Sequence, residues 1–292
     1  MHCLAWSMFS LRRPYKLRIL HSSVAVSASN LVKNFLLTPI EKRELTRLEK
    51  SLSTWKMPRH VGLILDGNRR FAREMGMADV VKGHELGADK LYEVLNWIYD
   101  TGIEIVTVWI FSIDNFNRHS DEVERLLRLI AHKTDELTTH PDVHQNELKV
   151  RYIGRTDLLP DYLQDAIASA ENATAHYSRH TLNVAIAYGG REEITDAFKR
   201  YLQAHSGNGK SIADLAETFS EDSISLHTYT AGQPDPDLII RTSGEVRLSG
   251  FMLWQSAYSE YYFCDSYWPG FRKLDFLRAL HEYNQRQRRF GR

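Results

Sequence analysis

The sequence has few cysteines, no long apolar run and no excess of charge of either sign. Only Cys3 and Cys264 are cysteine among the 292 residues, and their separation fits neither a metal site nor a redox pair. This excludes a disulfide framework and suggests a reducing compartment. No apolar run approaches the roughly 20 residues of a membrane-spanning helix. Because basic and acidic residues balance at 37 each, a broadly basic nucleic-acid-binding protein is not expected.

Residues 1–40 lack Asp and Glu altogether, whereas their basic side chains lie among Ser and apolar residues. This composition fits an organelle transit peptide, a flexible basic tail or an amphipathic segment that binds a membrane surface. In residues 31–51 an apolar stretch precedes a charged helix, which predicts a segment that lies against a membrane or caps the domain. We therefore divide the chain into residues 1–55, a basic tail with an amphipathic helix, and a folded domain, residues 56–292.

From Pro58 onward, apolar runs of strand length alternate with helical patterns, which is typical of right-handed crossover units and a parallel sheet. Strands are predicted at residues 61–65, 104–111, 149–153, 182–187 and 238–240, and helices at 85–99, 121–137, 159–177, 192–204, 212–217 and 274–289. The fold class is therefore a single α/β domain. Ligands of such open sheets collect beyond the carboxyl ends of the strands, so polar residues that follow a strand are the candidates for a site.

The first such candidate is the run HVGLILDGNRRFAR, residues 60–73. Asp66 ends a buried strand, and Gly67 and Asn68 are turn formers ahead of a helix start. Free N–H groups at a helix start, next to Arg69 and Arg70, would attract an anion. One carboxylate beside bound phosphate oxygens also suits Mg²⁺. A plain Asp-Gly-Asn turn is the default interpretation of these residues taken alone.

Two further strand ends carry polar residues. They are Ser112, Asp114, Asn115 and Arg118 after the second strand, and Arg241, Glu245, Arg247 and Ser249 after the last. Arginine presents a fork that matches phosphate oxygens. Each cluster also has a plain interpretation, with Asp114 and Asn115 capping the next helix and Glu245 pairing with Arg247 on a solvated turn. Three such strand ends together favour a ligand that carries phosphate.

Three more residues have two interpretations each. His84 is either a helix-start residue or a proton carrier. Glu260 lies in an aromatic and apolar stretch, so it is either buried and paired or a metal ligand. Arg289 belongs either to a solvated basic tail or to a phosphate site across an interface.

Several long motifs occur in a fixed order from Pro58 to Gly291. They are DGNRRFA (66–72), GHELG (83–87), FSIDNFNR (111–118), NVAIAYGGREEI (183–194) and PDLIIRTSGEVRLSGFMLWQSAYSEYYF (236–263), followed by WPGF and RRFG. The set resembles the cis-prenyltransferases, which include undecaprenyl and dehydrodolichyl diphosphate synthases. The motif sequences RRFA and RTSGEVRLS are closer to those of eukaryotic and archaeal-type members of this family.

The resemblance implies sequential condensation of isopentenyl diphosphate with an allylic diphosphate, farnesyl or geranylgeranyl. The product would be a Z-polyprenyl diphosphate, the precursor of a glycosyl carrier lipid. It also implies Mg²⁺, a central parallel sheet of about six strands surrounded by helices, and an apolar tunnel for the product. The expected assembly is a homodimer with peripheral membrane contact, either cytoplasmic or at a membrane surface, with organelle targeting left open. A short-chain or atypical prenyltransferase and a subunit of a heteromeric cis-prenyltransferase are the alternatives.

The resemblance also implies roles for individual residues. Asp66 and Asn115 would be catalytic, with Asn115 positioning or relaying the proton taken from C2, and Asp66 and Glu260 would be associated with the metal. Substrate binding is expected at Gly67, Asn68, Arg69, Arg70, Phe71, His84, Ser112, Ile113, Asp114, Phe116, Arg118, Arg241, Arg247, Leu248, Ser249, Arg289 and Gly291. Arg241, Arg247 and Ser249 would hold isopentenyl diphosphate, and Arg289 and Gly291 would reach the partner subunit's site.

Overall fold

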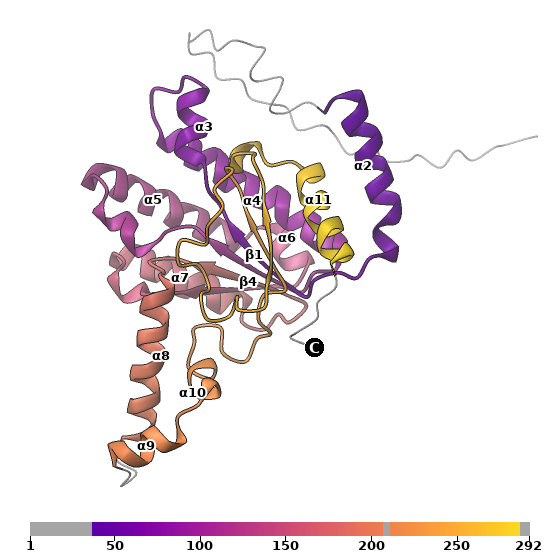
Figure 1. The fold of residues 1–292 in the computed structure, drawn as a ribbon. Helices are drawn as coiled ribbons and strands as arrows, with labels where there is room; N and C mark the ends of the chain where they lie inside the picture. Colours follow the sequence, from indigo (N-terminus) through magenta and orange to yellow (C-terminus); the bar gives the residue numbers. More distant parts are fainter. Residues whose placement is uncertain (1–36, 207–210, 287–292) are drawn as a thin grey trace, which may run out of the picture.

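The computed structural model describes residues 37–206 and 211–286, and these form a six-stranded parallel sheet in the order β3-β4-β2-β1-β5-β6. The strands are β1 (His60–Ile64), β2 (Ile105–Trp109), β3 (Leu148–Ile153), β4 (His180–Ala185), β5 (Leu238–Arg241) and β6 (Glu260–Phe263). Helices lie on both sides of the sheet (Figure 1). The parallel α/β fold predicted from the alternation of strands and helices is confirmed.

The helices agree with the predicted periodicity to within a few residues at most ends. They are α2 (Pro39–Ser51), α3 (Asn68–Glu74), α4 (Val81–Thr101), α5 (Ser120–Leu137), α6 (Pro141–Gln145), α7 (Asp161–Thr174), α8 (Gly190–His205), α9 (Ile212–Thr218), α10 (Glu221–Ser225) and α11 (Lys273–Gln285). The sequence pattern missed α6 and α10, because five residues are too few for an apolar face to repeat.

Apolar residues bury both faces of the sheet. On one face, Val94 and Ile98 of α4 pack with Val106 and Val108 of β2 and with side chains of α11. On the other face, Ile64 and its neighbours pack against aromatic residues of the segments that follow β4 and β5. The continuous apolar composition of β1 therefore reflects burial on both sides.

Strand β6 is the one strand that the sequence pattern missed. It lies at the edge of the sheet and pairs only with β5. Its sequence, EYYF, is partly exposed at every position, so it lacks the apolar run that marks the buried strands.

Helix α2 belongs to the segment predicted either to lie against a membrane or to cap the domain. Thr38 and Glu41 close its first turn as a capping box. The helix then lies beside α11 (Figure 1), where Glu44 pairs with Arg278 at 2.6 Å. The described part of residues 31–51 therefore caps the domain.

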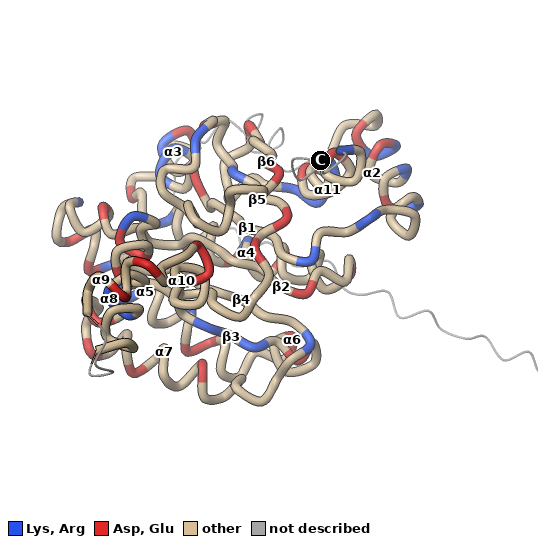
Figure 2. The backbone as a smooth tube through the Cα atoms, turned by 60° about the horizontal axis from the view of Figure 1, so that its bottom comes forward, with Lys and Arg blue, Asp and Glu red and all other residues tan. Residues whose placement is uncertain are grey.

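Charge of both signs is spread along the chain. In Figure 2, residues of both signs occur on helices such as α2, α5 and α8, whereas α10 carries only acidic residues. No helix within residues 37–206 and 211–286 is long and apolar enough to cross a membrane.

Candidate functional site

The carboxyl ends of β1, β2 and β5 lie next to one another, because Ile64 is in register with both Trp109 and Arg241. The three polar clusters predicted from the strand ends therefore meet around one cavity. Its walls are Ile64, Leu65, Asp66, Gly67, Asn68, Arg69, Arg70, Arg73, His84, Trp109, Ile110, Phe111, Ser112, Asn115, Arg118 and Arg241. We call this space the charged cavity.

The turn after β1 is fixed by its neighbours. The hydroxyl of Thr242 accepts the Asp66 N–H at 3.0 Å and donates to the Asp66 carbonyl at 2.7 Å. The Trp268 N–H donates to the same carbonyl at 3.0 Å. Gly67 has a φ of +102°, and a Cβ there would lie 2.6 Å from the ring of Tyr267. This position therefore requires glycine. The hydrogen bonds with Thr242 and Trp268 fix the Asp66 backbone, so that its side chain lies on the cavity wall.

Two arginines hold the Asp66 carboxylate. Arg241 Nη2 donates to Oδ2 at 2.8 Å, and Arg70 Nη2 donates to Oδ1 at 3.2 Å. Burial by itself would raise the pKa of Asp66. The hydrogen bonds from Arg241 and Ser243, with the charges of Arg241 and Arg70, outweigh burial and hold this pKa below its usual value. The side chain is therefore an ionised carboxylate at neutral pH.

The segment after β5 closes over the same arginines. Arg241, 4% exposed, donates to Ser249 Oγ at 2.9 Å and to the Arg247 carbonyl. Glu245 pairs with Arg70 at 2.9 Å as well as with Arg247. The plain interpretation of Glu245 is therefore incomplete, because this carboxylate joins the third cluster to the first.

Arg247 and Leu248 stand back from the charged cavity. The Arg247 side chain is largely exposed and paired with Glu245, and Leu248 packs against the apolar cluster on the second face of the sheet, to which Ile64 belongs. Neither side chain lines the cavity walls.

The second cluster combines both predicted interpretations. Asn115 accepts the Ser112 N–H on its Oδ1 at 3.1 Å, so it caps the 3₁₀ turn Ile113–Asn117. It also lines the charged cavity with Ser112. Because the amide oxygen is engaged with backbone, the amide N–H₂ is the group left for a ligand. Asn115 is therefore placed to donate a hydrogen bond rather than to accept a proton.

Several predicted contact residues point elsewhere. Phe71 is 1% exposed and buried in the core, so it supports α3 instead of facing a ligand. Phe116 packs edge-on against Phe111 with ring centroids 4.9 Å apart. Ile113, Asp114 and Phe116 are all absent from the cavity walls, whereas Ser112 and Asn115 of the same segment line them. The structure does not place these side chains on the cavity walls, and their contact with a substrate stays a prediction.

Buried polar atoms without hydrogen-bond partners gather in the charged cavity. They are Asn68 Oδ1, Arg69 Nε, His84 Nε2, Trp109 Nε1 and Arg241 Nε. Buried polar groups are normally paired, so these atoms are available to hydrogen-bond a ligand or water, although Arg69 Nε also lies 3.4 Å from the Glu122 carboxylate. Trp109 was not predicted, because a tryptophan at a strand end reads as core. An indole at the end of β2, beside the cluster predicted there, was the available signal.

His84 is neutral in this setting. Burial, together with the smaller effect of the nearby Arg118 and Arg69 charges, lowers its pKa to about 4. A bound anion beside the imidazole would raise the pKa of His84.

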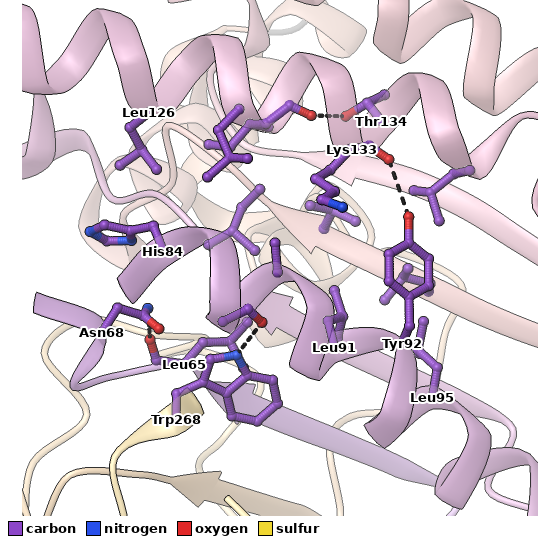
Figure 3. Close-up of a pocket in the computed structure, with 18 of the residues that line it drawn as sticks. Leu65, Asn68, His84, Leu91, Tyr92, Leu95, Leu126, Lys133, Thr134 and Trp268 are labelled. Carbon is purple, nitrogen blue, oxygen red and sulfur yellow. Dashed lines mark hydrogen bonds between the residues drawn. The ribbon is translucent and has the colours of Figure 1, made fainter. Parts of the chain in front are cut away.

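A second, apolar cavity adjoins the first. It lies between α4, α5 and the sheet, and Leu65, Asn68, His84 and Ile110 line both cavities. Figure 3 shows Asn68 and His84 at one end and Tyr92 and Lys133 at the other. Most of its remaining walls are leucine, isoleucine and valine side chains. We call this space the apolar corridor; its place between α4 and α5 makes it the candidate for the apolar tunnel that the resemblance implied.

Glu260 is not brought to Asp66 within this chain. It begins β6 in register with Leu238, which pairs with Val61, whereas Asp66 follows the far end of β1. Five residue steps of strand correspond to roughly 16 Å. Glu260 instead binds Arg286 at 2.7 Å. Within this chain the two predicted metal-associated carboxylates therefore lie apart, and the metal role of Glu260 stays a prediction. Arg289 and Gly291 lie outside the described residues.

Comparisons with known proteins agree with these features. The family described as "Putative undecaprenyl diphosphate synthase" matches residues 64–291. An isoprenyl transferase of Deinococcus radiodurans is 52% identical over 236 residues, which are 81% of this chain and 86% of that protein. A protein of Methanocaldococcus jannaschii named tritrans,polycis-undecaprenyl-diphosphate synthase (geranylgeranyl-diphosphate specific) is 47% identical, over 84% of this chain and 86% of that protein.

A solved structure is similar as well. Lavandulyl diphosphate synthase from Lavandula x intermedia, in complex with dimethylallyl diphosphate, superposes with a TM-score of 0.73 at 36% identity. The match covers 81% of this chain and 99% of that one.

Proposed function

The chain belongs to the undecaprenyl diphosphate synthase family of cis-prenyltransferases, and from this premise we propose that it condenses isopentenyl diphosphate with an allylic diphosphate in repeated steps. The product is a Z-polyprenyl diphosphate that serves as the precursor of a glycosyl carrier lipid. Farnesyl and geranylgeranyl diphosphate are the starters considered.

The observation that carries this proposal is the wall shared by the two cavities. Leu65, Asn68, His84 and Ile110 face both a space rich in guanidinium groups and a space lined by aliphatic side chains. A prenyl diphosphate has the matching form, with an anionic head and a hydrocarbon tail. A ligand with its head beside Arg69 and Arg70 would extend its tail between α4 and α5.

Asp66 suits a magnesium ion. Magnesium in proteins takes one or two carboxylates together with substrate phosphate oxygens, and Asp66 is ionised and aimed into the charged cavity. Groups of three or more His, Cys, Asp or Glu that suit a metal are absent from the described ranges, so the other ligands would come from substrate and water. Bound Mg²⁺ would offset the charge that builds on the leaving diphosphate.

Different residues of the chain would bind the two diphosphates. Asn68, Arg69 and Arg70 would bind the allylic diphosphate, whose departure leaves an electron-deficient carbon at the mouth of the corridor. Arg241 and Ser249 would hold the second diphosphate, with Arg247 recruited from Glu245. The new carbon–carbon bond forms when the double bond of isopentenyl diphosphate attacks that carbon, and loss of the C2 proton completes the step.

Asn115 would orient this proton transfer rather than perform it. Its amide oxygen already accepts the Ser112 N–H, and its N–H₂ group is able to donate to a diphosphate oxygen. That diphosphate is the stronger proton acceptor in the cavity. This role predicts that Asn115→Asp, which replaces a donor with an acceptor, does not preserve activity.

The test is direct. Purified protein is incubated with Mg²⁺, labelled isopentenyl diphosphate and either farnesyl or geranylgeranyl diphosphate, and the products are separated by chain length. Longer prenyl diphosphates support the proposal. Absence of any elongated product with either starter rules out catalysis by this chain alone, and would favour the interpretation as a subunit of a heteromeric enzyme.

Two parts of the proposal have their own tests. The homodimer, implied by the ending with Arg289 and Gly291, predicts twice the mass of the 33.8 kDa chain in sedimentation equilibrium. The likeness to lavandulyl diphosphate synthase favours a second candidate, a short-chain or atypical prenyltransferase. That candidate predicts products that stop after one or two additions, or coupling to dimethylallyl diphosphate.

A further inference from the structure

One aromatic ring lines the charged cavity but not the apolar corridor. Trp109 ends β2 and belongs to the wall of the charged cavity alone. Two other apolar side chains share that position, Ile64 and Phe111, but they are only 5% and 1% exposed, whereas Trp109 is partly exposed. Among the described residues on this side of the cavity, the indole is therefore the apolar surface that a ligand is able to contact.

The strand register places this ring on the same side of the sheet as Arg241. Trp109 is in register with Ile64, and Ile64 is in register with Arg241, so the three side chains project from one face at one level. Two strand spacings separate Trp109 from Arg241, or roughly 10 Å between their backbones. In the proposed function, Arg241 holds the diphosphate of isopentenyl diphosphate. The five-carbon group of that substrate would then lie beside the indole, whereas the allylic tail extends into the corridor on the other face.

The ring is held in place by aromatic neighbours. It stacks on Phe251 with ring centroids 5.5 Å apart and an interplanar angle of 15°. It also meets Tyr188 edge-to-face, with centroids 6.1 Å apart. Aromatic contacts of this kind fix the orientation of a ring. Because Phe251 covers one face of the indole, the opposite face is the one available to a ligand.

The indole N–H of Trp109 differs from those of two other tryptophans. Trp268 donates its N–H to the Gly87 carbonyl at 2.7 Å, and Trp254 donates to Ser225 at 2.9 Å. Trp109 Nε1 is buried and has no such partner. An unpaired buried donor costs folding free energy that phenylalanine at this position would avoid. Packing therefore explains an aromatic ring here, but it does not explain an indole.

The condensation creates positive charge close to this ring. The double-bond electrons of isopentenyl diphosphate form the bond from its C4 to C1 of the allylic substrate, whose C1–oxygen bond breaks with the electron pair leaving on the diphosphate. C3 of isopentenyl diphosphate is then electron-deficient until C2 loses a proton and the C–H electron pair becomes the new double bond. The face of an aromatic ring attracts a cation within about 6 Å of its centre, and tryptophan does so most strongly.

We propose that Trp109 contacts the five-carbon group of isopentenyl diphosphate and stabilises the positive charge that develops on its C3. This inference rests on the proposed prenyl elongation. It gives the indole a function that its packing lacks, because indole has the strongest π face among the aromatic side chains. The allylic diphosphate binds at Arg69 and Arg70, so its affinity should not depend on this ring.

The first test grades the π surface. Trp109→Leu removes it, and we expect the single-turnover rate of the first condensation to fall by about 10- to 30-fold. Trp109→Phe keeps a weaker π face and should lose roughly threefold. Neither variant should change the KM for the allylic starter. Trp254→Leu is the matched control, because this partly buried indole is absent from the walls of both cavities, and it should retain the wild-type rate.

Fluorinated tryptophan separates charge stabilisation from packing. Ring fluorines withdraw electron density from the π face and barely change its size, so the wild-type rate should fall with each added fluorine. The same labelling of Trp109→Phe reports the other tryptophans and should leave its rate unchanged. If the wild type elongates its starter but both backgrounds respond equally to fluorination, the inference is wrong while the proposed function stands. If the wild type yields no elongated product, both fail.

Discussion

The charged cavity and the apolar corridor differ in whether their buried polar groups have hydrogen-bond partners, although four residues line both. In the cavity, buried polar atoms such as His84 Nε2 and Arg241 Nε are left without partners, which costs folding free energy. In the part of the corridor away from Asn68 and His84, polar groups are paired, as in the 2.7 Å bond between Thr134 and Tyr152. The unpaired polar groups at the charged cavity and the paired ones in the corridor favour a ligand whose charged group lies in the cavity.

The largest effect should come from removing the carboxylate of the charged cavity. Asp66→Asn keeps the shape of the side chain but loses its charge. We expect kcat to fall by about 10²–10³, the range typical for losing a group that stabilises transition-state charge. Steady-state kinetics with saturating Mg²⁺ measures this. Asp157→Asn removes an exposed carboxylate that pairs with Arg155, and it should leave kcat unchanged.

Two buried histidines, His60 in the core and His84 at the charged cavity, should make the stability of the protein depend on pH. Burial lowers the pKa of both His60 and His84 to about 4 from an unfolded value near 6.5. The unfolded chain therefore binds protons first as the pH falls. Stability that is fully present above pH 6.5 should be lost progressively toward pH 4, by about 3 kcal/mol for each histidine. Urea denaturation at a series of pH values measures the loss.

The same pair sharpens the comparison when a ligand is added. His60 bonds to the Pro234 carbonyl and the Thr107 hydroxyl, so an allylic diphosphate analogue should leave its pKa unchanged. The analogue should raise the pKa of His84, because its negative charge offsets Arg69 and Arg118. Titration of the two imidazoles by NMR separates these outcomes. Equal behaviour of both histidines would contradict the placement of the diphosphate.

A bulkier side chain in the corridor should affect the tail alone. Leu91→Phe narrows the space between α4 and α5, and overpacking of this kind costs about 1–3 kcal/mol. We expect shorter products and weaker binding of long starters, with the affinity for isopentenyl diphosphate unchanged. Product chromatography and KM values for both substrates test this. A rise in the KM for isopentenyl diphosphate alone would show that the corridor does not hold the tail.

The smallest effect is expected at the edge of the charged cavity. Ser249→Ala removes the hydroxyl that accepts from Arg241 at 2.9 Å. A hydrogen bond of this kind contributes about 0.5–1.5 kcal/mol, so the KM for isopentenyl diphosphate should rise by about two- to tenfold. The KM for the allylic starter should not change. Equal changes in both KM values would mean that one diphosphate, not two, uses this side of the cavity.

Sequence reasoning found the polar strand ends because β1, β2 and β5 are buried runs that end in turn formers and arginine. That these ends share one edge of the sheet followed from its parallel strands, but the strand order that makes them neighbours came only from the structure. It did not find β6, whose partly exposed EYYF lacks that signal, and so it did not see that Glu260 begins an edge strand facing Arg286. Side-chain direction was equally out of reach, as Phe71 illustrates: whether a residue of a helix's first turn faces core or cavity depends on neighbours distant in sequence.

The central claim is that one ligand occupies both spaces, with its diphosphate in the charged cavity and its tail in the apolar corridor. A crystal structure with a non-cleavable farnesyl diphosphate analogue tests this most directly. We predict the diphosphate within hydrogen-bond distance of Arg69 and Arg70 and the tail in contact with Leu91, ending near Tyr92. A tail that lies outside the space between α4 and α5, with the head bound elsewhere than the turn after β1, would contradict the account.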